Sequence, residues 1–213
     1  MSKDLDNANV LLPINVNKIF EGRYAIIKPI TENEINDRYL SWVNDKEINR
    51  YLEVRHKKQN KKSLIEYINL LRRRNKCELF AIFTKKDLIH IGNATITGYN
   101  ANNLGIGDFG IMIGDIKAQS MGLGAEIHVI LLEYFFRDPS ILRINAGVAS
   151  QNTNAWKTLE SLGYIRDVVK RKYVPLENGK RCDGYFYRIL RDEWLLQRNK
   201  LKKIIDSVVI SDL

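Results

Sequence analysis

The sequence has few cysteines and no long apolar run. Its two cysteines, Cys77 and Cys182, are too few for a disulfide scaffold and too far apart for a typical zinc site. No stretch approaches the roughly 20 apolar residues that cross a bilayer. The polar start, MSKDLDNANV, lacks the apolar centre of a signal peptide. We therefore expect a cytoplasmic protein with two ordinary thiols and no membrane partner.

Residue groups that reveal a metal centre or a hydrolytic triad are also missing. No pair of His, Cys or acidic residues has metal-ligand spacing, and no Ser, His and Asp occupy recognisable positions. Among the histidines, His90 lies in an expected strand, where a hydrogen-bonded structural role is more common than that of a base; His56 and His128 offer less. We expect no metal cofactor.

Length and composition indicate one globular domain. Hydrophobic residues make up 45% and charged residues 28% of the 213 residues, which is ordinary for a soluble protein with a sizeable core. We expect an N-terminal arm over 1–22, a single domain over 23–190 and a helical C-terminal extension over 191–213. Monomer and homodimer are both compatible with this organisation.

The net charge of +9 is concentrated in one segment. Between Arg55 and Lys76 there are nine Lys and Arg residues against one acid, Glu66, which gives +8. Such a segment either attracts an anionic partner or forms a solvated helix face. Because aromatic residues are not interleaved with the charges, nucleic acid is not the expected partner.

The apolar pattern predicts helices mixed with strands. Strands are expected over 24–30, 79–83, 88–99, 106–113, 142–148, 164–173 and 184–190. Helices are expected over 31–42, which a Thr31–Glu34 capping box opens, and over 45–51, 61–74, 122–137, 153–162 and 191–205. This order indicates an α+β fold with a mixed, mostly antiparallel central sheet and helices on both faces.

One segment, GDFGIMIGDIKAQSMGLG over 107–124, carries the chemistry. A glycine-rich strand leads into a helix start that contains Gly122 and Gly124. Glycines there leave backbone amides unshielded, and these amides together with the helix dipole favour an anionic group such as a diphosphate. The alternative is that the glycines let the helix pack closely on the sheet.

Three motifs, in the right order, resemble the GNAT N-acetyltransferase superfamily. Gln119-x-x-Gly122-x-Gly124 resembles its acetyl-coenzyme A diphosphate loop, and the strand DFGIMIG over 108–114 resembles its central strand. NTNA over 152–155 with LESLGY over 159–164 is similar to the branch of ribosomal-protein N-terminal acetyltransferases and related amino-sugar acetyltransferases. The resemblance covers 23–190.

The resemblance implies a GNAT-like fold in which acetyl-coenzyme A is the cosubstrate. In that fold the central strand separates from its neighbour, and its free backbone groups bind the pantetheine arm. The implied coenzyme-binding residues are Ile111, Met112, Ile113, Gln119, Met121, Gly122, Leu123, Gly124 and Asn152. A backbone N–H near 111–113 would polarise the thioester carbonyl. Asn152 is equally compatible with an N-cap of the next helix.

The resemblance also implies a proton acceptor, because an alkylammonium must lose a proton before it attacks. Asp108 matches the family position that often carries a carboxylate, as a base or a water-orienting residue; a surface acid is the alternative. The general acid stays unassigned. The serine of the most similar branch is Ala155 here and the tyrosine of other branches is Leu159, while Tyr164, Tyr173 and Tyr185 are as compatible with packing.

The acceptor residues implied by the fold are Trp42, Tyr51, Glu53 and Arg55. Glu53 is suited to an ammonium and Arg55 to a phosphate, although a surface ion pair is the alternative for both. We expect an N-acetyltransferase acting on a primary amine, best an anionic small molecule such as a nucleotide-linked amino sugar. A peptide acceptor, the N-terminus of a ribosomal or other protein, is the next candidate. A non-catalytic basic adaptor for coenzyme or nucleic acid is the competing class.

Overall fold

The structure is a computed structural model that describes residues 17–73, 77–97, 105–106, 108–119, 121–176 and 179–213. Its strands are β1 (Lys18–Glu21), β2 (Ala25–Pro29), β3 (Glu78–Thr84), β4 (His90–Thr97), β5 (Gly105–Ile106), β6 (Asp108–Ile113), β7 (Arg143–Ala149), β8 (Ile165–Pro175), β9 (Arg181–Leu190) and β10 (Val209–Asp212). Its helices are η1 (Glu32–Glu34), α1 (Asp37–Asn44), α2 (Lys46–Asn49), η2 (Glu53–His56), α3 (Lys61–Arg73), α4 (Ile116–Gln119), α5 (Leu123–Phe135), α6 (Thr153–Ser161), α7 (Arg191–Gln197), η5 (Arg198–Leu201) and α8 (Lys202–Ile205).

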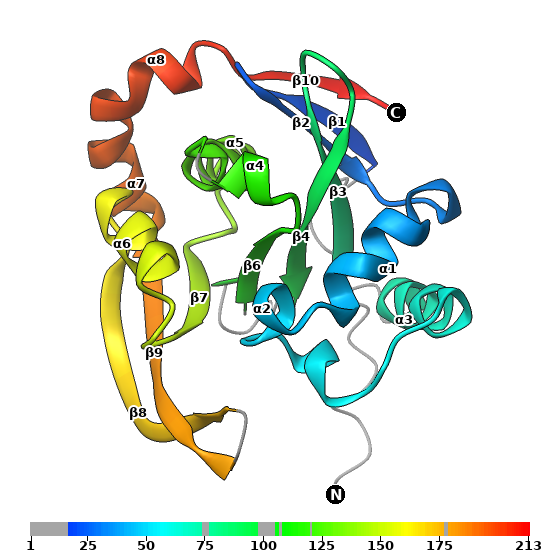
Figure 1. The fold of residues 1–213 in the computed structure, drawn as a ribbon. Helices are drawn as coiled ribbons and strands as arrows, with labels where there is room; N and C mark the ends of the chain where they lie inside the picture. Colours follow the sequence, from blue (N-terminus) through cyan, green and yellow to red (C-terminus); the bar gives the residue numbers. More distant parts are fainter. Residues whose placement is uncertain (1–16, 74–76, 98–104, 107, 120, 177–178) are drawn as a thin grey trace, which may run out of the picture.

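The strands form two sheets, and helices cover them on both faces (Figure 1). One sheet has six strands in the order β10-β1-β2-β3-β4-β6, and the other has four in the order β5-β7-β9-β8. Among the described residues, all of the pairings are antiparallel except the parallel pair of β5 and β7. The expected α+β class and the mostly antiparallel pairing are therefore confirmed, with the expected central sheet divided into two.

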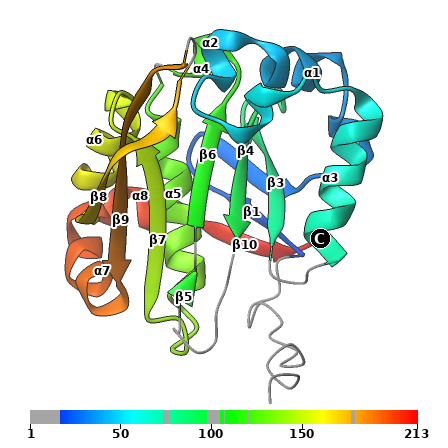
Figure 2. The same cartoon turned by 90° about the horizontal axis from the view of Figure 1, so that it is seen from below.

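The division between the sheets creates a fork. β5 pairs in parallel with β7, Gly105 opposite Arg143 and Ile106 opposite Ile144. β6 follows in the chain, and in the described residues it pairs with β4 and with no other strand. Figure 2 shows β6 and β7 next to each other, with β4 and β3 beyond β6 and β9 and β8 beyond β7. We call the opening between β6 and β7 the fork.

Two apolar clusters hold the layers together. The larger one packs α5 against both sheets and buries residues such as Phe80, Ile130 and Tyr187. The smaller one packs α1 and α3 on the opposite face of the six-stranded sheet, around Trp42 and Leu79. α5 therefore spans the fork on one face, which explains why nearly all of its residues are buried.

The first helical segment begins differently from the expectation. Thr31 and Glu34 do form the capping box, but this box caps the N-terminus of the short 3₁₀ turn η1. α1 begins later, at Asp37, and the side chain of Asn36 accepts a hydrogen bond from the Tyr39 amide as its N-cap. The prediction of a single helix over 31–42 is therefore wrong, because Asn36 caps a second, separate helix after the turn.

The two ends of the chain pair with each other, which the apolar pattern did not predict. β10 lies antiparallel to β1, so regular structure starts at Lys18 rather than at the expected Arg23. The end of the expected helical extension, 191–213, is a strand instead. Trp194, 1% exposed, donates to the Glu133 carboxylate at 2.8 Å, and this contact docks the extension on α5.

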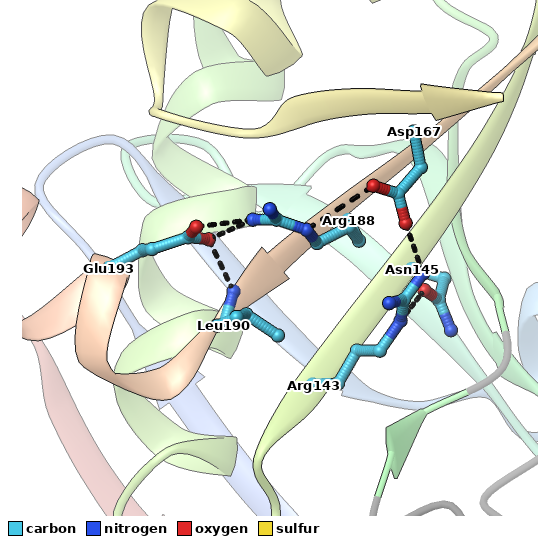
Figure 3. A network of polar contacts seen from close by, with 6 residues as sticks. All are labelled: Arg143, Asn145, Asp167, Arg188, Leu190 and Glu193. Carbon is cyan, nitrogen blue, oxygen red and sulfur yellow. Dashed lines mark hydrogen bonds and ion pairs between the residues drawn. The ribbon is translucent and has the colours of Figure 1, made fainter.

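A network of ion pairs and hydrogen bonds connects the four-stranded sheet to the start of α7 (Figure 3). Asp167 on β8 pairs with Arg143 on β7 at 2.7 Å and with Arg188 on β9 at 3.4 Å. Arg188 also pairs with Glu193, whose carboxylate accepts from the Leu190 amide at 2.9 Å. The network crosses three neighbouring strands, so it holds the β7 side of the fork as one unit.

Buried histidines predict loss of stability in acid. Burial lowers the pKa of His128 from 6.5 to about 3 and that of His90 from 6.5 to about 4. Below pH 6.5 the unfolded chain takes up protons that the folded chain does not, so the free energy of unfolding falls as pH falls from 6.5 toward 4. Each histidine contributes a slope of up to about 1.4 kcal/mol per pH unit.

Urea unfolding at a series of pH values measures this slope. We expect His128→Gln to reduce the slope between about pH 6 and pH 4, because the variant has no imidazole to protonate in the unfolded state. His56→Gln is the matched control, since it removes an exposed histidine. Equal slopes for the wild type and His128→Gln would contradict the assignment.

Candidate active site

On the edge of β6 that faces the fork, the backbone N–H and C=O groups of alternate residues point away from β4. The Gly114 amide donates to Ile91 on β4 at 2.9 Å, whereas the carbonyl oxygen of Ile113 accepts from the Gln119 side chain at 2.9 Å. Ile113 therefore points its backbone groups away from β4. Because the direction alternates along a strand, those of Ile111 point the same way. The side chains of Ile111 and Ile113 pack on the larger cluster, and Met112 packs on the smaller one.

Open space lies beside the two glycines at the start of α5. Gly122 is the N-cap of α5 with φ +70°, a left-handed conformation that favours glycine. A Cβ atom added at Gly122 or Gly124 would meet nothing within 4 Å. Leu123, 1% exposed, anchors the turn in the core, while Met121 is 56% exposed. The turn thus has an uncovered helix N-terminus, the feature that binds phosphate groups.

Gln119 connects this turn to the fork. It is the last residue of α4, and its hydrogen bond to the Ile113 carbonyl ties the turn to the end of β6. The coenzyme residues expected on the strand and those expected on the turn are therefore brought together. This hydrogen bond places the end of β6 beside the segment that leads to the N-terminus of α5.

Asp108 lies at the opposite end of β6, where the fork closes. Its carboxylate accepts from the Gly147 amide on β7 at 3.1 Å and from the amide of Phe109. Desolvation by the surrounding protein raises the pKa of Asp108, and the two amides offset part of this rise. At about 3.3 Å per residue, Asp108 lies about 10 Å along the strand from Ile111. The sequence offered no signal for the contact with Gly147.

Asn152 lies on the other side of the fork, after β7. Its side-chain oxygen accepts from the Ala155 amide at 3.4 Å as the N-cap of α6. The N-cap, one of the two interpretations of Asn152, is therefore present, and the residue is half-buried. Leu159, on the same helix, is 4% exposed and belongs to the core.

The tyrosines that were candidate acids have packing partners. Tyr164 is buried, desolvation raises its pKa, and its hydroxyl lies 3.5 Å from Nδ1 of His128. The guanidinium of Arg166 lies 4.0 Å from the ring centroid of Tyr185. Tyr173, half-exposed, packs edge-on against Phe186.

His90 is buried among aromatic rings rather than exposed at a site. Its Nε2 lies 3.0 Å from the Gly92 carbonyl oxygen, and the ring of Trp42 is 5.1 Å away. Because burial lowers its pKa to about 4, the imidazole is neutral near pH 7. This environment agrees with the structural role that the sequence favoured.

The acceptor residues lie in different environments around α1, α2 and η2. Trp42 is 5% exposed and packs where a Cβ at Gly114 would come within 2.1 Å of its ring, so it walls the end of β6. The Arg50 guanidinium lies over the ring of Tyr51, 5.2 Å from the ring centroid. The side chain of Glu53 is 90% exposed, and its carboxylate is 4.0 Å from the Arg55 guanidinium.

A cavity of about 370 Å³ opens beside these residues, between α2, η2 and the end of β8. We call it the basic cavity. Its basic lining consists of Lys46, Arg50, Arg55, His56, Lys57 and Lys58. Of these, only Arg55 was predicted as a site residue. The basic run that begins at Arg55 is a signal for Lys57 and Lys58, whereas Lys46 and Arg50 precede that run.

That basic run does not form one patch. Its first part lines the basic cavity, whereas Arg72 lies at the end of α3, where it donates to the Ile30 carbonyl and pairs with Glu78 at 3.3 Å. Lys61 and Lys62 are exposed at the start of α3. Residues 74–76 lie outside the described residues. The basic run is therefore divided between two regions of the molecule.

In the part of the chain that the structure describes, no three His, Cys, Asp or Glu side chains gather as metal ligands. No helix in the same residues has the length and apolarity to span a membrane.

Comparison with known proteins identifies the family. The model of the GNAT acetyltransferase domain matches residues 25–165, so the chain belongs to this family and is an N-acetyltransferase. The uncharacterised N-acetyltransferase p20 of Bacillus licheniformis is 25% identical over 165 residues, 76% of this chain and 91% of p20. The uncharacterised N-acetyltransferase YnaD of Bacillus subtilis is 30% identical over 76 residues, 36% of this chain and 44% of YnaD.

Solved structures share the fold. The spermidine N-acetyltransferase of Vibrio cholerae, solved with CoA and spermine, matches with a TM-score of 0.70 and 19% identity over 80% of this chain and 98% of that chain. The ribosomal α-N-protein acetyltransferase RimL, solved with coenzyme A, matches with a TM-score of 0.69 and 15% identity over 80% of this chain and 96% of that chain. Enzymes of the family use acetyl-CoA and transfer its acetyl group to an amine.

Proposed function

We propose that this chain transfers the acetyl group of acetyl-CoA to the primary amine of an anionic small molecule, such as a nucleotide-linked amino sugar. The observation that carries the choice of acceptor is the basic cavity, which opens beside Tyr51, Glu53 and Arg55. Membership of the family supplies the reaction class, and the cavity supplies the charge that the acceptor must complement.

The fork and the turn at Gly122 support a coenzyme site in this chain. The outward backbone groups of Ile111 and Ile113 suit a pantetheine arm that lies along β6 like an added strand. The diphosphate would lie at the N-terminus of α5, next to Gly122 and Gly124, where open space adjoins the amides. Asn152 faces this arm from the β7 side in our proposal.

Acetyl transfer itself requires the amine nitrogen to attack the thioester carbonyl carbon. One proton of the ammonium first leaves to solvent. A C–N bond then forms and the C–S bond breaks, and the second proton lost by the nitrogen ends on the departing thiolate, which is released as the free thiol of coenzyme A. A backbone N–H of β6 near Ile111 would donate to the carbonyl oxygen, and such donors contribute about 3 to 4 kcal/mol in acyl transfer. Asp108 holds the closed end of the fork and orients water toward the amine in this proposal.

The charge of the cavity disfavours a polycation as acceptor. The Vibrio cholerae neighbour acts on spermidine, and a polyamine approaching the basic cavity would meet like charge. A protein N-terminus, as in RimL, is the second candidate, since the exposed Glu53 carboxylate is available to an ammonium. The non-catalytic adaptor, the competing class, rested on Ala155 and Leu159 in place of the family's serine and tyrosine, and membership of an acetyltransferase family argues against it.

A thiol-release assay with a panel of amines tests the proposal. We expect acetyl-CoA-dependent thiol release with a nucleotide-linked amino sugar at a kcat/KM about tenfold or more above that for spermine, and falling with added salt because the attraction is screened. A peptide with a free N-terminus forms the third arm. Preference for that peptide would replace the small-molecule acceptor. No thiol release with any amine, together with salt-sensitive RNA binding, would favour the adaptor.

A further inference from the structure

We infer that the basic cavity is a phosphate site that holds a phosphate or diphosphate group of the acceptor, apart from the diphosphate site at the N-terminus of α5. The inference rests on the proposed function only for the identity of the molecule that carries the phosphate. The first argument is charge. Five of its lining residues carry a Lys or Arg cation, and none of the described residues that line it is acidic.

Nearby acids do not cancel this charge. Glu47 pairs with Arg50 at 3.4 Å, and Glu53 lies 4.0 Å from Arg55 and 3.9 Å from His56. Both carboxylate side chains are at least 84% exposed, so water screens them. Counting both acids against the four cations other than Lys46 still leaves a charge of +2 around the cavity.

The second argument is that the walls are already ordered. Arg55, whose side chain is 9% exposed, donates to the Leu52 carbonyl at 2.6 Å and to the Pro175 carbonyl at 2.9 Å. These bonds fix η2 to the end of β8 and leave other guanidinium N–H groups for a ligand. Asn44 accepts from the Gln59 amide at 2.8 Å and donates to the Gln59 carbonyl at 3.0 Å. An ordered wall reduces the entropy lost on binding.

The third argument is size. A cavity of about 370 Å³ falls within the range of small-molecule sites. Such a volume accommodates a diphosphate together with a small attached group, whereas a nucleic-acid duplex would contact only its rim. Arg and Lys are the side chains that bind phosphate oxygens most strongly, through charge-assisted hydrogen bonds. A phosphate-bearing small molecule therefore fits the cavity better than RNA does.

Isothermal titration of inorganic pyrophosphate into the chain saturated with coenzyme A tests the inference. Saturation fills the site at α5, so any remaining heat reports a second site. We expect one further binding event, and we expect the double variant Lys57→Glu/Lys58→Glu to weaken it about tenfold or more. Both lysines are exposed, so the fold should tolerate their replacement.

The double variant Lys202→Glu/Lys203→Glu is the matched control. It makes the same change in net charge at two exposed positions of α8, and we expect it to alter the dissociation constant less than about twofold. No second event in the saturated wild type, or equal weakening in the two double variants, would overturn the inference. Displacement of pyrophosphate by a single-stranded RNA oligonucleotide but not by a nucleoside diphosphate would overturn the small-molecule assignment.

The two proposals fail in different ways. Pyrophosphate binding without thiol release from any amine would leave the phosphate site standing and remove the proposed acceptor. Thiol release with uncharged and anionic amines at equal kcat/KM, without pyrophosphate binding, would leave the transferase standing and remove the phosphate site.

Discussion

Gly122→Val is expected to weaken binding of coenzyme A by about 100-fold, the loss that two charge-assisted hydrogen bonds would cause. Gly122 has φ +70°, and a β-branched residue there costs about 1 to 3 kcal/mol of strain. We expect the variant to relieve this strain by rotating the backbone at position 122, which turns the amides at the start of α5 away from their present direction. The added side chain also occupies the open space in which the diphosphate is proposed to lie. Titration calorimetry measures the dissociation constant.

Gly179→Val is the control that distinguishes weaker coenzyme binding from a general loss of stability. Gly179 has φ +71° and open space around a Cβ, so its replacement carries the same strain in the loop between β8 and β9. We expect Gly179→Val to bind coenzyme A as the wild type does and to lower the melting temperature as much as Gly122→Val does. Equal weakening of coenzyme binding in both variants would contradict a diphosphate site at α5.

Asp108→Ala is expected to lower kcat/KM by about 100-fold, because a shift of about 1 Å in a positioned site costs that much. The variant removes the carboxylate that accepts from the Gly147 amide and so releases the closed end of the fork. Asp108→Asn keeps an acceptor oxygen at the same place. We expect it to lower kcat/KM by about tenfold or less.

The pH profile of Asp108→Asn distinguishes positioning from proton transfer. The distance of about 10 Å from Ile111 argues against direct proton abstraction at the amine, so we expect the acidic limb of kcat/KM to persist in this variant. The raised pKa of Asp108 is the property that a general base would need. Loss of the acidic limb, with Asn as damaging as Ala, would assign Asp108 as the base.

Local patterns were sufficient for most elements. The spacing of Leu64, Ile68 and Leu71 predicted α3, and these residues are buried as expected, although Tyr67 in the same pattern is 40% exposed. The motif around Gly122 likewise predicted a helix start, and α5 begins there. Such features depend on neighbours within one or two turns of the chain, which is why a sequence alone predicts them.

Contacts between distant segments could not be predicted in the same way. The strands β1 and β10 have four residues each and are stabilised by pairing across nearly the whole chain. Nor did the motif at Asp108 indicate that its carboxylate meets Gly147, since the contact exists only where β6 and β7 converge. A strand pairing depends on a partner that local periodicity does not specify.

The family, the helix start at Gly122 and the excess of positive charge could be predicted from the sequence, because contiguous motifs and the composition carry them. Where that charge acts depends on the folded structure. Folding divides the basic run between the cavity at Arg55 and the ion pair of Arg72 with Glu78. It also brings to the cavity Lys46 of α2 and Arg50, which follows α2 directly. The physical reason is that electrostatic attraction depends on distance in space, which folding sets and spacing along the chain does not.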